Sequence, residues 1–323
     1  MEEHIAQQPH DRHPGSPGSR PRSQAFRRPR VLLMMLCAAV LAVALGAGFH
    51  SAAQARSTAA AQPAGQSESQ APASAPASPA ASPATPATGT IDAELDAEIN
   101  GIIDAHPDYQ IGVALLDLSA GADAAGAVHE YGVPSAFVAA STAKVLAAEA
   151  YYHLVETGAA SLDDPLGAYT AEFQLKAMIQ QSDNDSWSLI MDAVGHTEMT
   201  DYAASIGVDY RPESNTLTPA EMAHILSGLY TGTLLDPVHT SQLLGYMQDT
   251  NYETLIPAAV PADITVFHKY GLLGGELHDA GILARDGSSY ALVVYTRGED
   301  LGSVPERTDA IHQITAAVAD ALF

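Results

Sequence analysis

The stretch FVAASTAKVLAAEAYYHL, residues 137 to 154, joins two small hydroxyl residues and a lysine to a long apolar run. This pattern predicts a buried helix from Ser141 to Thr157, stopped by Gly158 in the position where glycine commonly follows a helix. Ser141 and Lys144 are three positions apart and therefore share a helical face. Two interpretations are open. Ser141 caps the helix while Lys144 reaches solvent, or Ser141 is a nucleophile with Lys144 as its base.

The second interpretation has a physical basis in the helix start itself. An amine near the positive end of a helix dipole, and partly out of water, has a lowered pKa. A neutral lysine could then take the serine proton, and backbone N–H groups at the same helix start could stabilise an oxyanion. The spacing S-x-x-K alone does not decide between the two interpretations, because it occurs often by chance.

The first 89 residues have the composition of a targeting segment and a linker. Residues 1–30 are basic, residues 31–49 are apolar over about the length of a membrane-crossing helix, and residues 50–89 are mainly Ala, Pro and Ser. We expect a basic cytoplasmic region, a signal or membrane anchor helix and a disordered linker. Cleavage and retention of the anchor both stay open. Residues 90–323 should be extracytoplasmic, either secreted or tethered to the outer face of the cytoplasmic membrane.

The domain at residues 90–323 is strongly acidic, with 34 acidic residues and seven basic ones. Such a surface repels the phosphate backbone, so a nucleic-acid partner is excluded as a function class. The only cysteine, Cys37, lies in the apolar run, so the domain has no disulfide and must rely on an ordinary core. We expect a monomer.

The order of periodic patterns predicts the architecture. A helix is expected at residues 91–105, strands in YQIGVALLDLSAG and AVHEYG, helices through residues 162–249, strands after Ile264 and a last helix at residues 305–322. Asp286-Gly287-Ser288-Ser289 is a hairpin signal. The pattern predicts an α/β (α+β) fold. An antiparallel sheet is flanked by N- and C-terminal helices, and an all-helical lobe is inserted between its strands.

Two further segments carry polar residues that the packing pattern does not require. QSDNDSW places Ser182 and Asn184 in a turn just before a helix, and FHKYGLLGG places Lys269 and Gly271 at the end of a strand. Taken alone, the first is an ordinary turn and N-cap and the second an exposed edge lysine. However, the domain has only three lysines, and two of them, Lys144 and Lys269, stand at these positions.

In this order, Ser141-Thr-Ala-Lys144, Ser182-Asp-Asn184 and Lys269-Tyr-Gly271 resemble the S-x-x-K, S-D-N and K-T-G motifs of class A β-lactamases and related penicillin-recognising enzymes. The resemblance spans roughly residues 91–323. It also includes HDAGIL with YALVVYTRG, similar to the strands after K-T-G, and TLTPAEMAHIL, similar to the helix start after that family's active-site loop.

The resemblance implies a role for each matching residue. Ser141 would be acylated, Lys144 would act as general base or proton relay, and the Ser182 hydroxyl would pass a proton to the leaving nitrogen. Asn184 would bind the substrate's side-chain amide. Lys269, with Tyr270 and Gly271, would bind its carboxylate. The backbone N–H groups of Ser141 and Leu272 would form the oxyanion hole.

Two positions depart from the family pattern. Tyr270 replaces the usual Thr or Ser, and its hydroxyl lies several ångströms further out. The loop that typically reads E-P-E-L-N is here Arg211-Pro-Glu213-Ser-Asn215, so an arginine stands where the base for the deacylating water is expected. We therefore predict acylation by β-lactams with slow deacylation. Glu213 would take over as the base only if the loop has a different shape.

Three functions are compatible with these residues. The first is a β-lactamase-like serine hydrolase that forms an acyl-enzyme with β-lactams or related amides. The second is a D,D-peptidase or transpeptidase on peptidoglycan stems, and the third a non-catalytic binding domain that keeps the fold. No cofactor is implied. His268 and His278 flank the second lysine but show no metal-ligand spacing, so we expect structural or surface histidines and no metal site.

Overall fold

The computed structural model describes residues 90–121 and 126–323, and the predicted signal or anchor helix and linker lie outside them. The longer helices are α1 (Ala93–Asp104), α2 (Lys144–Glu156), α3 (Ala171–Gln180), α4 (Asn184–Val194), α5 (His196–Ser205), α6 (Pro219–Tyr230), α7 (Pro237–Tyr246) and α8 (Val304–Leu322). Short 3-10 turns are η2 (Ala140–Ala143), η3 (Ile256–Ala259) and η4 (Leu301–Ser303). Among the described residues, no helix is long and apolar enough to cross a bilayer.

The strands form one main sheet and two small pairs. The main sheet is antiparallel in the order β2-β1-β9-β8-β7, which confirms the predicted fold. Its strands are β1 (Gln110–Asp117), β2 (His129–Gly132), β7 (Thr265–Leu273), β8 (Glu276–Arg285) and β9 (Ser288–Arg297). The small pairs join β3 (Phe137–Val138) to β6 (Thr216–Leu217) and β4 (Pro165–Leu166) to β5 (Tyr169–Thr170).

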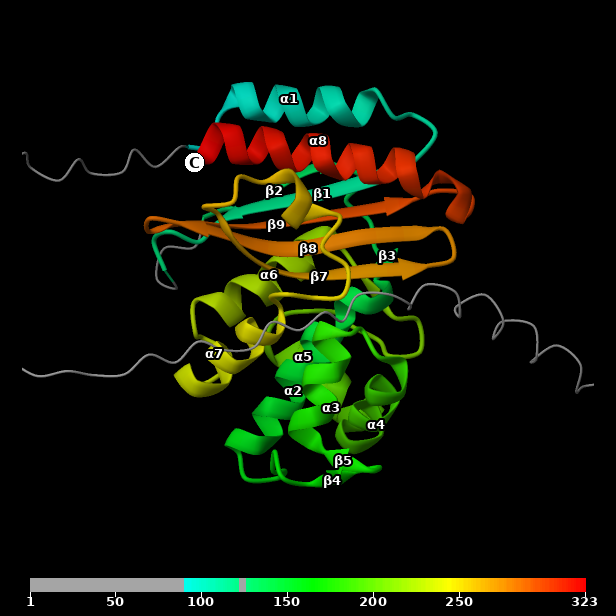
Figure 1. Cartoon of the computed structure of the whole chain (residues 1–323), viewed down its shortest axis with the longest axis vertical. Helices are drawn as coiled ribbons and strands as arrows, with labels where there is room; N and C mark the ends of the chain where they lie inside the picture. Colours follow the sequence, from blue (N-terminus) through cyan, green and yellow to red (C-terminus); the bar gives the residue numbers. More distant parts are fainter. Residues whose placement is uncertain (1–89, 122–125) are drawn as a thin grey trace, which may run out of the picture. The chain divides into compact units, whose positions relative to one another are not determined.

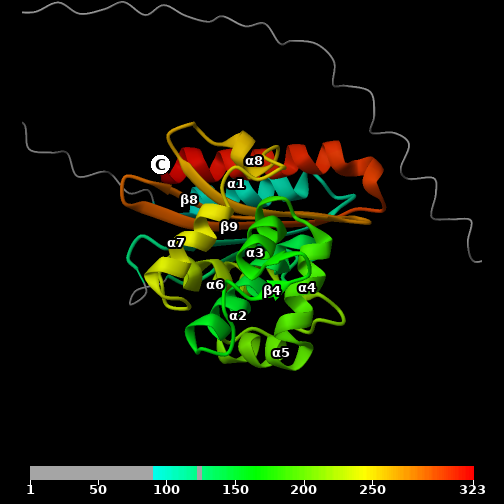
Figure 2. The same cartoon turned by 60° about the horizontal axis from the view of Figure 1, so that its bottom comes forward.

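The main sheet separates two hydrophobic cores (Figure 1). Helices α1 and α8 cover one face, and the helical lobe of α2 to α7 lies against the other (Figures 1 and 2). Along β1, Val113 and Leu115 enter the first core while Ala114 and Leu116 enter the second. Because alternate residues of a strand point to opposite faces, a sheet covered on both sides has apolar strands throughout. Each fully buried Leu contributes about 1.5–3 kcal/mol.

Two local details differ from the sequence-based expectations. The helix predicted from Ser141 begins at Lys144, because residues 140–143 form the tighter 3-10 turn η2. Lys269 lies in the middle of β7, not at a strand end, because β7 continues to Leu273 and pairs with β8 along its whole length. The hairpin at Asp286 and Gly287 has positive φ at both residues, as a two-residue turn between twisted strands requires.

Candidate active site

The candidate nucleophile Ser141 lies on turn η2, between the sheet and helix α2. Ala140 before it has φ +50, a backbone conformation that residues other than glycine seldom adopt. Three contacts hold this strained turn. The Ala139 N–H donates to the carbonyl of Asn215 at 2.8 Å, the Asn215 amide donates to the carbonyl of Ala140 at 3.1 Å, and His278 Nε2 lies 2.9 Å from the carbonyl of Val138. The backbone around Ser141 is therefore fixed from several sides.

Strand β7 approaches the Ser141 turn closely at Gly271. A Cβ atom on Gly271 would lie 3.1 Å from the carbonyl oxygen of Ala139, 3.1 Å from Cβ of Ala140 and 3.2 Å from the Ser141 nitrogen. Contacts this short leave little room for any side chain, so glycine sets the spacing between β7 and the turn. Leu272, the next residue, is 38% exposed. Because Gly271 lies against the Ser141 turn, the backbone of Leu272, the next residue of β7, also lies near that turn.

Lys144 is the first residue of α2, and its ammonium is directed at the turn that precedes α4. Its Nζ atom donates to the carbonyl of Ser182 at 2.7 Å and to Oδ1 of Asn184 at 2.8 Å, and it lies 3.4 Å from Oγ of Ser182. Burial lowers the pKa of Lys144 to about 8, against the opposing charge of Asp183. An amine with this pKa is partly neutral near pH 8 and can accept a proton.

The turn that receives Lys144 has its own strained residue. Ser182 has φ +54, and Asp183 caps α4 by accepting the Ser186 N–H at 2.7 Å. Asn184, expected in the turn, is instead the first residue of α4. The cap fixes the start of α4, and the carbonyls of Ser182 and Asp183 both accept from Lys144. Ser182 and Asn184 thus both contact Lys144.

The second lysine, Lys269, is fully buried on β7. Its Nζ atom donates to the carbonyl of Tyr270 at 3.2 Å and lies 4.1 Å from the centroid of the Tyr270 ring. Burial, followed by repulsion from Lys144, holds the pKa of Lys269 well below its usual range. The sequence taken alone suggested that Lys269 is an exposed lysine at a strand edge, and the structure shows it buried.

The loop from Asp209 to Asn215 places only one predicted residue against the Ser141 turn. The Arg211 side chain is 68% exposed and lies 3.3 Å from Asp209. The Glu213 side chain is 71% exposed and lies 3.0 Å from Nδ1 of His196. Asn215 is the residue that bonds to the turn, and the Tyr210 hydroxyl donates to its Oδ1 at 3.0 Å.

Both histidines that flank Lys269 in the sequence are buried and structural. His278 stacks on Tyr295 with ring centroids 4.2 Å apart, and burial lowers its pKa to about 4. Burial also acts to lower the pKa of His268, but Asp279 and Glu253 outweigh it and raise that pKa to about 9. His268 Nδ1 donates to Asp279 at 2.9 Å and Nε2 to Glu253 at 3.1 Å.

Two groups of residues beside the site have no signal in the sequence. Thr142 and Tyr295 join their hydroxyls at 2.6 Å beneath the Ser141 turn. Asn251 bonds to Tyr270 and also to the end of α3. Neither group has a characteristic spacing, since its members come from distant segments. The only sequence feature that could have marked Tyr295 as a site residue is its polar hydroxyl on the otherwise apolar strand β9.

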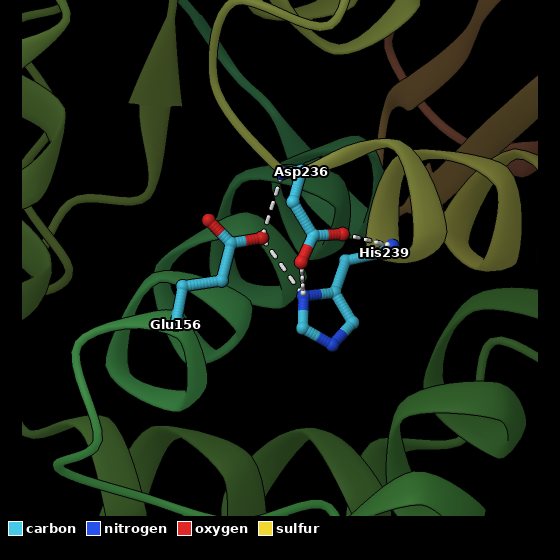
Figure 3. Close-up of side chains that lie close together, drawn as sticks. All are labelled: Glu156, Asp236 and His239. Atoms are coloured by element: carbon cyan, nitrogen blue, oxygen red, sulfur yellow. Dashed lines mark hydrogen bonds and ion pairs between the residues drawn. The ribbon is translucent and has the colours of Figure 1, made fainter.

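Elsewhere in the described residues, Glu156, Asp236 and His239 bring two carboxylates and an imidazole together (Figure 3). His239 Nδ1 lies 2.8 Å from Glu156 and 3.5 Å from Asp236. These residue types can bind Zn²⁺. Here, however, Asp236 caps α7, and Glu156 accepts the Asp236 N–H at 2.8 Å, so the contacts already join α2 to α7.

The antiparallel sheet with its helical lobe, and the contact of Lys144 with Ser182 and Asn184, are those of the β-lactamase-like serine hydrolases. The solved structures that are similar to this chain include the following three. PBP-A has 24% identity, covers 71% of this chain and 96% of its own, and has a TM-score of 0.63. A β-lactamase from Xanthomonas campestris pv. campestris has 23% identity, with 71% and 97% covered and a TM-score of 0.63. The ancestral (GNCA) class A β-lactamase has 25% identity, with 71% and 100% covered and a TM-score of 0.63.

A family model gives the more specific assignment. The model of the Beta-lactamase enzyme family matches residues 94–322, which include every predicted site residue. The chain therefore belongs to the Beta-lactamase enzyme family, and the resemblance seen in the sequence is confirmed at the level of family and fold.

Proposed function

We propose that this protein is a serine hydrolase that forms an acyl-enzyme at Ser141 with β-lactams or related amides. The observation that carries the proposal is the buried Lys144 amine, whose pKa is lowered to about 8 and whose hydrogen bonds reach Ser182 and Asn184. A buried lysine with a lowered pKa, here 3.4 Å from Oγ of Ser182, has the properties of a general base in its neutral form. A variant of the similar protein PBP-A is an acyl-enzyme complex with penicillin G, which agrees with this chemistry.

The proposed acylation proceeds as a balanced proton and acyl transfer. Neutral Lys144 takes the proton of the Ser141 hydroxyl as Oγ attacks the amide carbon. The developing oxyanion accepts hydrogen bonds from the backbone N–H groups of Ser141 and Leu272. As the C–N bond breaks, the Ser182 hydroxyl gives its proton to the leaving nitrogen and regains one from Lys144. Asn184 accepts from Lys144 through Oδ1, which leaves its NH₂ group to bind the substrate's side-chain carbonyl.

We expect deacylation to be slow because the loop offers no base close to the ester. Arg211 and Glu213 are both largely exposed, and each is paired with another side chain. The lowered pKa of Glu213, which its backbone and His196 hydrogen bonds favour, means that it is ionised but engaged. General-base assistance is worth about 10²–10⁴-fold, so its loss leaves a long-lived acyl-enzyme.

The test is a time course of intact mass on the full-length protein with penicillin G. The expected result is a single penicilloyl adduct that forms and then persists, and that is absent from Ser141→Ala. Failure to form any adduct would contradict the acyl-enzyme proposal. Hydrolysis of a chromogenic cephalosporin at ordinary enzyme rates, with no persisting adduct, would contradict slow turnover.

A D,D-peptidase or transpeptidase on peptidoglycan stems is the second candidate, and the exposed loop residues favour it. An acyl-enzyme protected from water can be resolved by an amine instead. If this alternative holds, a peptide ending in D-Ala-D-Ala loses its last residue, and added D-amino acid exchanges into the product. The binding-domain alternative predicts the opposite outcome, with no adduct and no effect of Ser141→Ala on ligand affinity.

The cellular location is part of this proposal. The basic residues 1–30 and the apolar residues 31–49 favour export, with residues 90–323 outside the cytoplasmic membrane. Cell-wall stems and β-lactams are both met there. Protease added to intact cells should therefore degrade the domain, whereas a cytoplasmic control protein should survive.

A further inference from the structure

The residue that departs most from the K-T-G pattern also covers the lysine beside it. Lys269 has 0% of its surface exposed. The Tyr270 ring lies over its ammonium, with 4.1 Å between Nζ and the ring centroid. A ring at this distance is in contact with the amine and covers it on that side. In this structure, therefore, a substrate carboxylate has no direct access to the Lys269 ammonium.

Tyr270 is held in this position by two residues from another segment. Its hydroxyl donates to Oδ1 of Asn251 at 3.1 Å, and its ring lies against Tyr252 with centroids 4.7 Å apart. Asn251 is itself held by two hydrogen bonds. Its backbone N–H donates to the backbone carbonyl of Gln180, and its side-chain NH₂ donates to the backbone carbonyl of Gln181. Gln181 immediately precedes Ser182. Tyr270 and Asn251 thus form a bridge from the edge of β7 to the turn that carries Ser182.

Apart from Lys176, which is exposed on α3, the other lysine and the arginines of the described residues are already engaged with other groups. On β8 the residue paired with Lys269 is Ala280, and Lys144 is bonded to the Ser182 turn. The arginines of the described chain already have partners, in the order Arg211 with Asp209, Arg285 with Asp263, Arg297 with Glu276 and Arg307 with the carbonyl of Gly275. With 34 acidic residues against seven basic ones, residues 90–323 also repel anions at long range.

We infer that Tyr270 selects substrates by charge: its ring shields Lys269, so that the site prefers a neutral acyl donor over one with a carboxylate beside the scissile amide nitrogen. This inference rests on the proposed acyl-enzyme function and names the substrate class for it. Neutral amides or esters bind without displacing Tyr270. An anionic β-lactam must first break the Tyr270–Asn251 bond to reach Lys269.

The experiment compares penicillin G with its methyl ester, which has the same ring system but no charge. Second-order rates of adduct formation are measured by intact mass for wild type, Tyr270→Phe and Tyr270→Thr. Wild type should react with the ester at least as fast as with the anion. Tyr270→Thr exposes Lys269 and should raise the anion-to-ester ratio by about tenfold or more, because a charge-assisted hydrogen bond is then available. Tyr270→Phe, which keeps the ring but loses the bond to Asn251, should fall between them.

A second measurement reports shielding without any acylation. An amine-reactive acetylating reagent should label the exposed Lys176 quickly and Lys269 slowly in wild type, and Tyr270→Thr should speed labelling of Lys269 alone. The inference would be overturned if wild type reacted tenfold faster with the anion than with the ester. It would also be overturned if Tyr270→Thr changed neither the anion-to-ester rate ratio nor the labelling rate of Lys269. If no variant forms an adduct with either compound, the proposed function fails, and with it this inference about substrate choice.

Discussion

The surroundings of Lys144 and the loop from Asp209 to Asn215 both contact the Ser141 turn, yet they differ in almost every physical property. Lys144 is 3% exposed and bonded to backbone carbonyls at fixed positions, whereas the Arg211 side chain is 68% exposed and paired with one surface carboxylate. A surface ion pair contributes about 0–1 kcal/mol and exchanges readily with water. The comparison suggests a site organised to form an acyl bond, with far less organisation for breaking it.

The largest expected effect is on the Lys144 side of this comparison. Lys144→Met should slow adduct formation by about 10²–10⁴-fold, because it removes the proposed general base. Lys176→Met, a change at an exposed lysine on α3, is the matched control and should leave the rate unaltered. The measurement is the rate of adduct formation with penicillin G. Equal slowing by both variants, or by neither, would contradict the role of Lys144.

The loop side can be tested by adding the missing base. Arg211→Glu should speed loss of the adduct by less than about tenfold, below the full range of general-base assistance, because the side chain at this position is 68% exposed. Arg211→Gln removes the positive charge without supplying a base and serves as the control. The acyl-enzyme is isolated by gel filtration and followed by mass. If both variants deacylate equally fast, charge and not base chemistry controls the step.

The pH dependence of acylation sharpens the same contrast. The base must be neutral, and the pKa of Lys144 is lowered to about 8 by burial. Below pH 8 the rate should therefore rise about tenfold per pH unit, and above it the rate should level off. In Lys144→Met the residual rate should lack this rise. A wild-type profile that is flat from pH 6 to 9 would exclude Lys144 as the titrating base.

Asn215 connects the two regions, and its removal should have a moderate effect on both. Asn215→Ala removes the bond to the Ala140 carbonyl, and a bond of this kind contributes about 0.5–1.5 kcal/mol. We expect a melting temperature lower by several degrees and acylation slower by severalfold. Ser214→Ala, at the exposed neighbouring position, should change neither. An unchanged acylation rate in Asn215→Ala would show that the turn is held without it.

The smallest effect is expected at Glu213. Its carboxylate is 71% exposed and paired with His196, so Glu213→Gln should alter deacylation less than about twofold. His196→Gln should have the same small effect, since it frees the carboxylate without moving the loop. A tenfold loss of deacylation in Glu213→Gln would identify Glu213 as the base after all.

The sequence predicted the fold, and it singled out Lys144, Ser182 and Asn184, which contact one another in the structure, because those features depend on periodicity and on short, ordered motifs. The grouping of Ser141 with them stays a prediction. It did not predict the 3-10 turn at residues 140–143. The positive φ of Ala140 is stabilised by Asn215 and by the close approach of Gly271, contacts that join segments far apart in the chain. Local propensity carries no information about such contacts.

The environment of Lys269 was equally hidden from the sequence. Tyr270 could be recognised as a departure from the family pattern, but its contact with Lys269 depends on Asn251 and Tyr252. Those residues lie in a connecting segment without any periodic signal. The ion pairs of His268 with Asp279 and Glu253 were hidden for the same reason, since cross-strand partners are fixed only by register.

The double attachment of Asn215 to the Ser141 turn also affects how this protein could change under selection. Under the proposed function, a variant that turns over β-lactams must release the adduct faster. Substitutions of the Arg211 side chain should not loosen the turn, because that side chain pairs with Asp209 in its own loop. Changes at Asn215 would weaken the nucleophile's support at the same time. Resistant variants should therefore accumulate at Arg211 and leave Asn215 intact.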